Sequence, residues 1–225
     1  MKKLREALLG GSFNPTTIAH IRMGDLSLKN NLVDKVVYIP CGIRSDKPEL
    51  ISGNYRLNFL KIDIHNHFHF KPNVFNSDCL NMFENEDKIL IDEFEIQTFK
   101  RIMPTSWLIK KYKSQYPNIE FKTIMGTDLL YSVKEWEEYD EVLKHEDYII
   151  FKREADFKDF DLMPKTYQLL FDEKIAKVSS TNVRNILKKG WENDLVLKDP
   201  HIKNQLLQYI SSDVLEYILK NQLFK

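Results

Sequence analysis

The chain reads Gly10-Gly11-Ser12-Phe13-Asn14-Pro15-Thr16-Thr17-Ile18-Ala19-His20 near its start, and this stretch indicates the fold class. It follows a short apolar run that ends at Leu9, and it leads into a helical pattern over residues 17–29. A strand that turns through two glycines into a helix is typical of the first unit of an α/β sheet. The glycines let a ligand approach the backbone and permit a positive φ, and the free N–H groups of the helix start attract an anion. We therefore predict a phosphate site at this turn.

Apolar runs alternate with helical patterns along the rest of the chain. We predict strands at residues 7–9, 36–39, 89–91, 119–125 and 148–151, and helices at residues 17–29, 55–64, 105–112, 180–189 and 213–221. This alternation predicts a single α/β domain over residues 1–225, a Rossmann-like doubly wound parallel sheet with a small helical C-terminal part from about residue 180. Ligands of such sheets bind beyond the carboxyl ends of the strands. The loops at residues 10–17, 40–53 and 126–136, with the segment before residue 180, are therefore the places to search.

Composition excludes several classes of function. The chain has 225 residues, of which 43% are hydrophobic, enough to bury a full core. Its 33 basic and 33 acidic side chains balance, so we expect no general attraction to nucleic acid or to an anionic membrane. No apolar stretch reaches the length of a signal-peptide core or a membrane span. The two cysteines, Cys41 and Cys79, are far apart, which suits a reducing compartment such as the cytoplasm. Nuclear entry and the oligomeric state, including a homo-oligomer, stay open.

The segment 65–88 breaks the alternating pattern. It is rich in Asn, His and Phe, and we interpret it as a surface insertion in loop conformation. His65, His67 and His69 alternate, so on an extended strand they would share one face and could bind a metal ion. No fixed ligand spacing completes such a site, which favours the plain surface insertion.

A second motif lies far along the chain, at Val178-Ser179-Ser180-Thr181-Asn182-Val183-Arg184. Consecutive Ser and Thr residues are good N-cap candidates, and that is the simpler local interpretation. In the functional interpretation the helix start faces a polyphosphate, and Arg184, on the same face as Ser180, offers a charge-assisted fork. His20 has a similar ambiguity, because a single histidine in a first helical turn is more often structural than catalytic. The GxGxxG and P-loop patterns are both absent.

Together the two motifs resemble those of the nicotinate/nicotinamide mononucleotide adenylyltransferases of the nucleotidyltransferase superfamily. GSFNPTTIAH resembles that family's GxFxPxHxxH-type loop, and VSSTNVR resembles its ISSTxxR-type motif. Gly126-Thr127-Asp128 followed by Trp136 looks like its GxD…W element, so the resemblance covers most of the chain outside residues 65–88. The first histidine of the family loop is Thr17 here, which leaves His20 as the one histidine to carry over.

The resemblance implies substrates and roles. The substrates would be ATP and nicotinate mononucleotide, with nicotinamide mononucleotide as a further acceptor, and Mg²⁺ would ride on the ATP phosphates with no metal ligand from the protein. The implied catalytic residues are His20 and Arg184. Those implied for ATP and its phosphates are Gly10, Gly11, Ser12, Phe13, Thr17, Ser179, Ser180 and Thr181. Those implied for the mononucleotide and ribose are Lys47, Thr105, Gly126, Asp128 and Trp136. Thr105 followed by Leu108 looks like the bacterial type, which prefers the nicotinate form.

Other interpretations stay open. Asp128 would also serve as a helix N-cap, Trp136 as a half-buried core aromatic, and Lys47 as a solvated surface charge. A phosphopantetheine adenylyltransferase or another small-molecule nucleotidyltransferase would share the first loop but lack the GxD…W element in this form. A non-catalytic nucleotide-binding module is a third alternative. The presence of both His20 and Arg184 argues against it, because binding alone rarely needs both.

Overall fold

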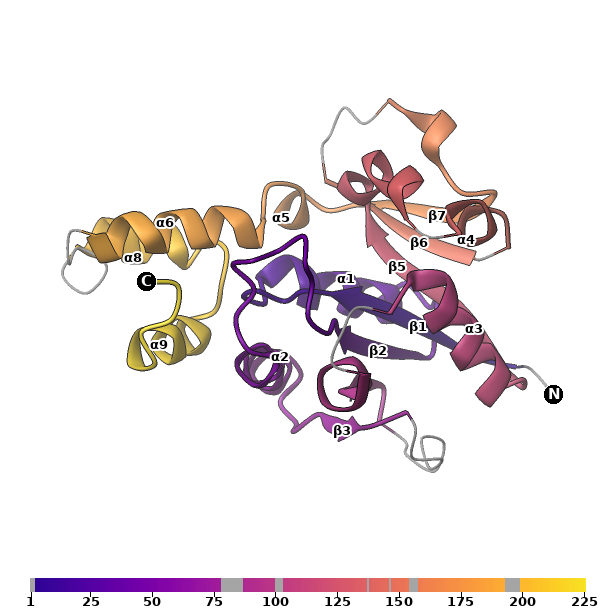
Figure 1. Ribbon diagram of the computed structural model, residues 1–225, viewed down its shortest axis with the longest axis horizontal. Helices are drawn as coiled ribbons and strands as arrows, with labels where there is room; N and C mark the ends of the chain where they lie inside the picture. The colour runs from indigo at the N-terminus through magenta and orange to yellow at the C-terminus, as the bar shows by residue number, and fades with distance from the viewer. Residues whose placement is uncertain are drawn as a thin grey trace.

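The computed structural model describes residues 3–77, 87–99, 103–136, 138–145, 147–153, 158–192 and 199–225. Its sheet has seven strands in the order β3-β4-β2-β1-β5-β6-β7 (Figure 1). They are β1 (Leu4–Gly11), β2 (Lys35–Pro40), β3 (Asn73–Phe75), β4 (Ile89–Asp92), β5 (Ile119–Gly126), β6 (Asp147–Lys152) and β7 (Thr166–Phe171). All neighbours pair in parallel. The chain builds outward from β1 on one side and returns to β5 on the other, so the strand order reverses beside β1, where such sheets bind ligands.

Helices cover both faces of the sheet. They are α1 (Ile18–Lys29), α2 (Gly53–Phe68), α3 (Thr105–Gln115), α4 (Tyr139–His145), α5 (Glu173–Ala176), α6 (Ser180–Glu192), α8 (Pro200–Leu206) and α9 (Ser212–Lys220). Short turns of other helix types are η2 (Glu95–Phe99), η3 (Thr127–Tyr131), η4 (Val133–Glu135) and η5 (Phe160–Leu162). Side chains of α1, α2 and α5 join the core on one face, and those of α3 and α4 join the clusters on the other. The predicted doubly wound α/β fold is confirmed.

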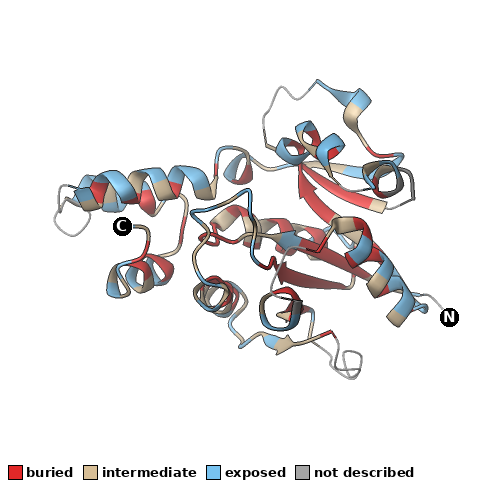
Figure 2. Cartoon of the chain, viewed as in Figure 1, coloured by how far each residue is buried: buried red, intermediate tan, exposed pale blue. Residues whose placement is uncertain are grey.

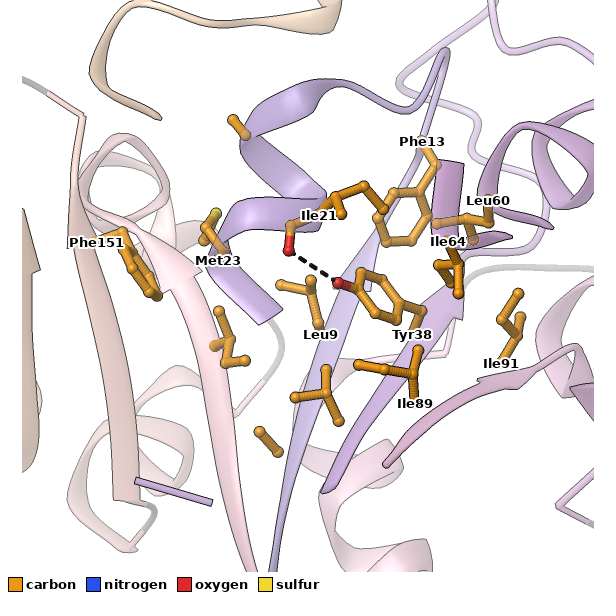
Figure 3. Packing of buried hydrophobic residues seen from close by; sticks show 14 of the residues in the cluster. Leu9, Phe13, Ile21, Met23, Tyr38, Leu60, Ile64, Ile89, Ile91 and Phe151 are labelled. Atoms are coloured by element: carbon orange, nitrogen blue, oxygen red, sulfur yellow. Dashed lines mark hydrogen bonds between the residues drawn. The ribbon is translucent and has the colours of Figure 1, made fainter. Parts of the chain in front are cut away.

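The two faces are filled by alternate residues of each strand. In β1, Leu9 packs with Ile21 of α1 and Tyr38 of β2, whereas its neighbour Leu8 packs with Ile109 of α3 (Figure 3). A strand buried on both faces presents a continuous apolar run, as β1 and β2 do. Figure 2 shows the central strands as the most buried part of the chain. The core therefore holds the carboxyl end of β1 rigidly.

The last part of the chain forms a helical unit on one side of the sheet (Figure 1). It starts at Ser180 and comprises α6, α8 and α9. Its apolar cluster includes Val183, Leu187 and Ile218, and it reaches the sheet domain through Phe59 of α2. The predicted helical C-terminal part is thus present, and its first helix begins beside the carboxyl ends of the strands.

The structure of segment 65–88 differs from the surface insertion in loop conformation that the sequence indicated. Residues 65–68 are the last turn of α2, and Asn73–Phe75 form the edge strand β3, so these parts are not an inserted loop. The prediction failed because α2 continues through an Asn- and His-rich sequence with weak helical periodicity. Residues 78–86, including Cys79, lie outside the described residues.

The three histidines do not share one face of an extended strand, as the metal hypothesis required. His65 and His67 lie on a helix, where a spacing of two residues points side chains in different directions. His69 ends that helix in the left-handed region, with φ 61°. His67 Nε2 lies 3.1 Å from a carboxylate oxygen of Asp25 in α1. His67 is therefore a helix-to-helix contact in the structure. Within the described ranges, no helix is long and apolar enough to cross a membrane.

Candidate active site

A cleft of about 510 Å³ opens at the carboxyl ends of β1, β2 and β5. Each of the four segments that the sequence singled out contributes to its wall, for example through Ser12, Lys47, Asp128 and Ser180. These segments are far apart in the chain and are brought together by the reversal of strand order beside β1. Every predicted site residue lines this cleft except Thr17.

The first loop and the end of β1 supply Gly10, Gly11, Ser12 and Phe13 to the cleft wall. Gly10 and Gly11 are the last residues of β1, and neither has the positive φ that a glycine permits. The left-handed residue is Phe13, with φ 46°, whose buried ring packs edge-on against His20. A Cβ added at Gly10 would meet no protein atom within 4 Å. Gly10 therefore leaves open space in which a ligand can contact the strand end directly.

His20 is held in one tautomer by its own helix start. The backbone N–H of Thr17 donates to Nδ1 of His20 over 3.0 Å, and Oγ1 of Thr17 lies 2.8 Å from the same nitrogen. An amide N–H only donates, so Nδ1 is the acceptor and the ring proton is on Nε2. Desolvation, with a smaller contribution from the charge of Arg153, lowers the pKa of His20 to about 3. The cleft is thus lined by a neutral imidazole whose Nε2 carries the ring proton.

Thr17 differs from its predicted role. Its side chain is fully buried, and it is the N-cap of α1 rather than part of the cleft wall. A threonine in place of the family's first histidine therefore acts through His20, which it orients.

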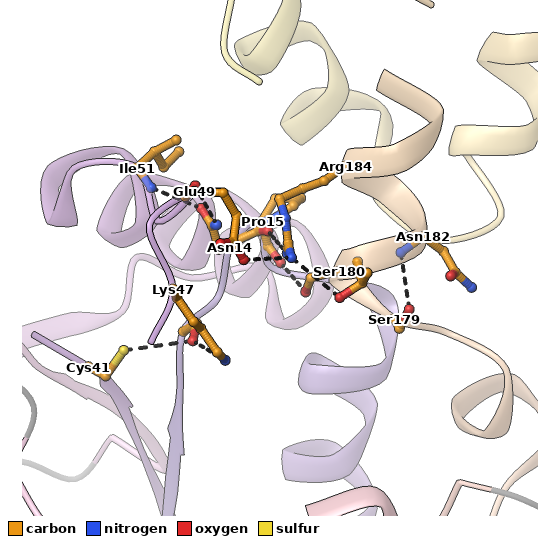
Figure 4. Close-up of polar contacts among 12 residues, drawn as sticks. Asn14, Pro15, Cys41, Lys47, Glu49, Ile51, Ser179, Ser180, Asn182 and Arg184 are labelled. Atoms are coloured by element: carbon orange, nitrogen blue, oxygen red, sulfur yellow. Dashed lines mark hydrogen bonds and ion pairs between the residues drawn. The ribbon is translucent and has the colours of Figure 1, made fainter. Parts of the chain in front are cut away.

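The start of α6 docks onto the first loop (Figure 4). Ser180 Oγ donates to the carbonyl of Pro15 over 2.8 Å. Arg184 Nη1 donates to the carbonyl of Asn14 over 2.9 Å, and its Nη2 lies 3.0 Å from Glu49 Oε1. Ser179 caps the helix by accepting from the N–H of Asn182 over 3.2 Å. The capping interpretation is therefore confirmed for Ser179, whereas Ser180 and Arg184 join α6 to the first loop.

Two helix starts thus face one cleft. The first turn of α1 contributes His20, and the first turns of α6 contribute Ser180, Thr181 and Arg184. Helix N-termini carry unpaired N–H groups and a partial positive charge, and both features stabilise phosphate. This arrangement suits a polyanion that lies between the two helices.

Lys47 comes from the loop after β2. Its Nζ donates to Ser12 Oγ over 3.0 Å, which joins this loop to the first one (Figure 4). Desolvation lowers the pKa of Lys47, and the charge of Arg44 acts in the same direction. Lys47 is therefore a half-buried cation on the cleft wall, unlike the solvated surface lysine of the alternative interpretation.

The carboxyl end of β5 forms the opposite wall with Gly126, Asp128 and Trp136. A Cβ on Gly126 would lie 2.2 Å from Oδ1 of Asp128 and 2.9 Å from the Arg153 side chain, so a larger residue there would displace these side chains. Arg153 also donates to the carbonyls of Ile175 and Val178, which fixes the segment just before α6. Arg153 thus ties the end of β6 to the second motif.

Thr105 is the first residue of α3 and lines the cleft together with Leu108. Between them Trp107 is 45% exposed and points away from the buried α3 face. The described cleft wall therefore has an apolar side at α3 and a cationic side at Lys47 and Arg184.

Two buried charged residues were missed by sequence reasoning. Arg56 of α2 is 2% exposed and donates to the carbonyls of Ser12, Cys41 and Ile51. Glu95 of η2 is 4% exposed, and its Oε2 accepts from the N–H groups of Gly42 and Met103. Burial raises the pKa of Glu95 to about 7. Arg56 lies in a predicted helix with no pattern that marks it as buried, so the sequence offered no signal for either residue.

Comparison with known proteins identifies the family. The family model described as cytidylyltransferase-like matches residues 8–186, which include both phosphate motifs. The chain belongs to the cytidylyltransferase-like family.

Relatives in this cytidylyltransferase-like family carry names that agree with one another. A protein of Fusobacterium nucleatum named "Probable nicotinate-nucleotide adenylyltransferase" is 28% identical over 82% of this chain and 88% of its own length. A protein of Clostridium botulinum with the same name is 26% identical over 99% of this chain and its full length. The solved Plasmodium falciparum nicotinic acid mononucleotide adenylyltransferase complexed with NaAD has a TM-score of 0.76 at 26% identity. That match covers 98% of this chain and 97% of the Plasmodium chain.

Nucleotidyltransferases such as those of the cytidylyltransferase-like family typically use a divalent metal ion. In the part of the chain that the structure describes, no three His, Cys, Asp or Glu side chains converge as a metal cage. The acidic residues of the cleft are dispersed, since Glu49 pairs with Arg184 and Asp128 lies 3.7 Å from Arg153. The site therefore fits a metal that arrives on the substrate's phosphates better than one held by protein ligands.

Proposed function

We propose that this protein transfers the adenylyl group of ATP to nicotinate mononucleotide, giving the deamido-NAD dinucleotide and pyrophosphate in NAD biosynthesis. One observation carries the proposal: the starts of α1 and α6 are joined directly, through Ser180 Oγ and the Pro15 carbonyl, at a single cleft. The names and the shared fold of the relatives described above support the same reaction. Nicotinamide mononucleotide is the second acceptor to be considered.

The chemistry requires positioning more than proton transfer. A phosphate oxygen of the mononucleotide attacks the α-phosphorus of ATP, a new P–O bond forms, and the bond to the β-phosphate oxygen breaks to release pyrophosphate. The nucleophile is already ionised, so no general base is needed. Rate enhancement then comes from aligning two polyanions and stabilising charge on the transferred and leaving oxygens. A neutral histidine donor and a half-buried arginine fork suit this task.

His20 and Arg184 take the two ends of the reacting phosphates. We assign the Nε2–H of His20 to an oxygen of the α- or β-phosphate, because Nε2 carries the ring proton and His20 lines the cleft. Arg184, with Ser180 and Thr181, would hold the leaving pyrophosphate. In the structure Arg184 Nη2 contacts Glu49, so bound phosphate would compete with this carboxylate for the guanidinium.

The acceptor lies on the side of β5 and α3 in this proposal. Trp136 would stack on the pyridine ring, Asp128 would accept from ribose hydroxyls, and Lys47 would pair with the mononucleotide phosphate. Thr105, at the start of α3, would lie beside the pyridine substituent. Gly10 and Gly11 would let the nucleotide lie against the end of β1. Mg²⁺ would enter as part of the Mg·ATP substrate, where it neutralises phosphate charge.

An acceptor comparison tests the proposal. Pyrophosphate release from ATP is measured with nicotinate mononucleotide, nicotinamide mononucleotide and phosphopantetheine. We expect the highest kcat/KM with the nicotinate form. A clear preference for the amide would contradict the proposed substrate, and turnover with phosphopantetheine alone would replace the proposed reaction. No release with any of the three would favour a nucleotide-binding module.

A further inference from the structure

One peptide group in the loop after β2 is held from both sides by buried charges. The carbonyl oxygen of Cys41 accepts from Nη2 of Arg56 over 2.7 Å. The N–H of the same peptide group, which belongs to Gly42, donates to Oε2 of Glu95 over 3.0 Å. Arg56 and Glu95 therefore interact through the Cys41–Gly42 peptide.

Each of the two charges also holds a second segment of the cleft. Arg56 Nη1 donates to the carbonyl of Ser12 in the first loop over 2.9 Å. Glu95 Oε2 accepts from the N–H of Met103, two residues before α3, over 3.2 Å. The peptide group therefore connects the first loop, which we call the phosphate loop, with the start of α3, where the pyridine ring is proposed to bind.

The burial of these groups gives the connection its strength. Arg56 is 2% exposed and Glu95 is 4% exposed, so water does not compete effectively for their hydrogen bonds. Hydrogen bonds to ionised groups are stronger than neutral ones. Arg56 is a cation, and the Glu95 carboxyl, whose pKa burial raises to about 7, becomes its opposite charge above that pH. The Cys41 N–H also donates to the Gly11 carbonyl over 2.9 Å, which joins the peptide to the end of β1.

We propose that Arg56 and Glu95 are positioning residues that act as one unit, a clamp on the Cys41–Gly42 peptide that sets the spacing between the phosphate loop and the start of α3. Ser12, whose carbonyl Arg56 holds, carries the hydroxyl that accepts from Lys47. Met103, whose N–H Glu95 holds, precedes Thr105. The clamp thus sets the relative positions of groups that the proposed function assigns to the two ends of the mononucleotide, and the inference rests on that function.

A double-mutant cycle tests the clamp. Arg56→Met and Glu95→Met remove the donors and acceptors at similar side-chain length, and each should lower kcat/KM for the mononucleotide about tenfold or more. Because both act through one peptide group, Arg56→Met/Glu95→Met should lose no more than the worse single variant. If the losses multiply in the double variant, the two residues act independently and the clamp is wrong.

Conservative variants separate positioning from plain loss of folding. Glu95→Gln keeps an acceptor oxygen, and it should retain most of the activity that Glu95→Met loses. Arg56→Lys keeps the charge but not the guanidinium fork. It should therefore retain less activity than Glu95→Gln does. If a methionine variant does not fold, Arg56→Gln and Glu95→Ala form the cycle instead. Equal activity of Glu95→Gln and Glu95→Met would overturn the role of that hydrogen bond.

Asp63→Asn is the matched control for removal of a buried carboxylate. Asp63 is 5% exposed and accepts from Ser211 between α2 and α9, away from the cleft. The Asp63→Asn variant should have a changed melting temperature but an unchanged kcat/KM per folded molecule. A fall in kcat/KM equal to that of the clamp variants would show that loss of any buried carboxylate produces the effect, which would overturn the proposal.

A binding readout separates this inference from the proposed function. The same cycle is run by calorimetry on the affinity for nicotinate mononucleotide, with no turnover required. A wild-type protein that binds the mononucleotide but does not react would contradict the proposed function while the cycle still tests the clamp. An active wild type whose variants show multiplicative losses in both affinity and kcat/KM would contradict the clamp alone.

Discussion

The backbone N–H of Thr17 donates to Nδ1 of His20 over 3.0 Å, so the helix that carries the histidine also fixes its tautomer. The ring proton is left on Nε2, and His20 lines the cleft. With its pKa lowered to about 3 by desolvation, the imidazole is neutral over the whole working range of pH. In the proposed function His20 is then a hydrogen-bond donor to a phosphate oxygen and not a proton-transfer group.

Replacing His20 tests this role. His20→Ala should lower kcat about 10²- to 10³-fold, as expected for removal of one preorganised donor to a developing charge. It also leaves the Thr17 N–H without its partner, which should cost about 1 kcal/mol of folding stability. Steady-state kinetics and urea denaturation measure the two effects. Normal turnover per folded molecule, together with a large loss of stability, would show that His20 is structural.

Arg184 should matter more for ATP than for the mononucleotide. Arg184→Ala removes the fork on the leaving pyrophosphate, so the KM for ATP should rise and kcat should fall, by about ten- to hundredfold together. The KM for the mononucleotide should change little. Glu49→Gln serves as the control, because it removes the carboxylate that contacts Arg184 but leaves the guanidinium. An equal loss of affinity for both substrates would contradict the assignment.

A larger side chain at position 10 should weaken ATP binding without destabilising the fold. Gly10→Ala adds a methyl group that meets no protein atom within 4 Å, so stability should stay within about 0.5 kcal/mol of wild type. The same methyl group would occupy space next to the nucleotide, and the KM for ATP should rise about tenfold. Thermal melts and kinetics on one preparation check both. Unchanged kinetics would place the nucleotide away from the end of β1.

Trp136 should contribute to acceptor binding by stacking. Trp136→Ala should raise the KM for the mononucleotide about tenfold, since base–aromatic stacking contributes about 1–3 kcal/mol. Trp136→Phe retains an aromatic face and should recover most of the affinity. An unchanged KM in the alanine variant, with reduced stability, would assign Trp136 to the core cluster that it borders.

The buried carboxyl group of Glu6 should make the free energy of unfolding depend on pH. It is fully buried in β1, neither carboxyl oxygen has a hydrogen-bond partner among the described residues, and desolvation raises its pKa to about 7 despite Lys35. Since this pKa exceeds the unfolded value, its contribution to stability is present at low pH and is lost as pH rises through 7. Between about pH 4 and pH 8, Glu6→Gln should therefore gain about 3 kcal/mol of unfolding free energy relative to wild type. Urea denaturation at both pH values measures it, and a difference independent of pH would contradict the prediction.

Periodicity predicted the central elements well. β1, β2, β5 and β6 are buried apolar runs, and α1 and α6 follow clear N-terminal Ser and Thr signals, so their local sequences agree with the tertiary fold. β3 and β7 were missed because both are edge strands with partly exposed residues, where no strong pattern is required. The histidines at residues 65–69 were misplaced because helix α2 is stabilised by packing of Leu60 and Ile64 more than by its own propensity.

By itself, the sequence determined the α/β class, the two motifs at residues 10–20 and 178–184, and many of the residues that line the cleft, because these depend on local pattern and on motif chemistry. The tertiary structure decided which residues hold or orient one another. Thr17 is buried and orients His20, Arg184 contacts Glu49 and the Asn14 carbonyl, and Arg56 and Glu95 meet through a peptide group of another loop. These relationships join segments far apart in the chain, and only packing around the reversal of strand order brings them within hydrogen-bond distance.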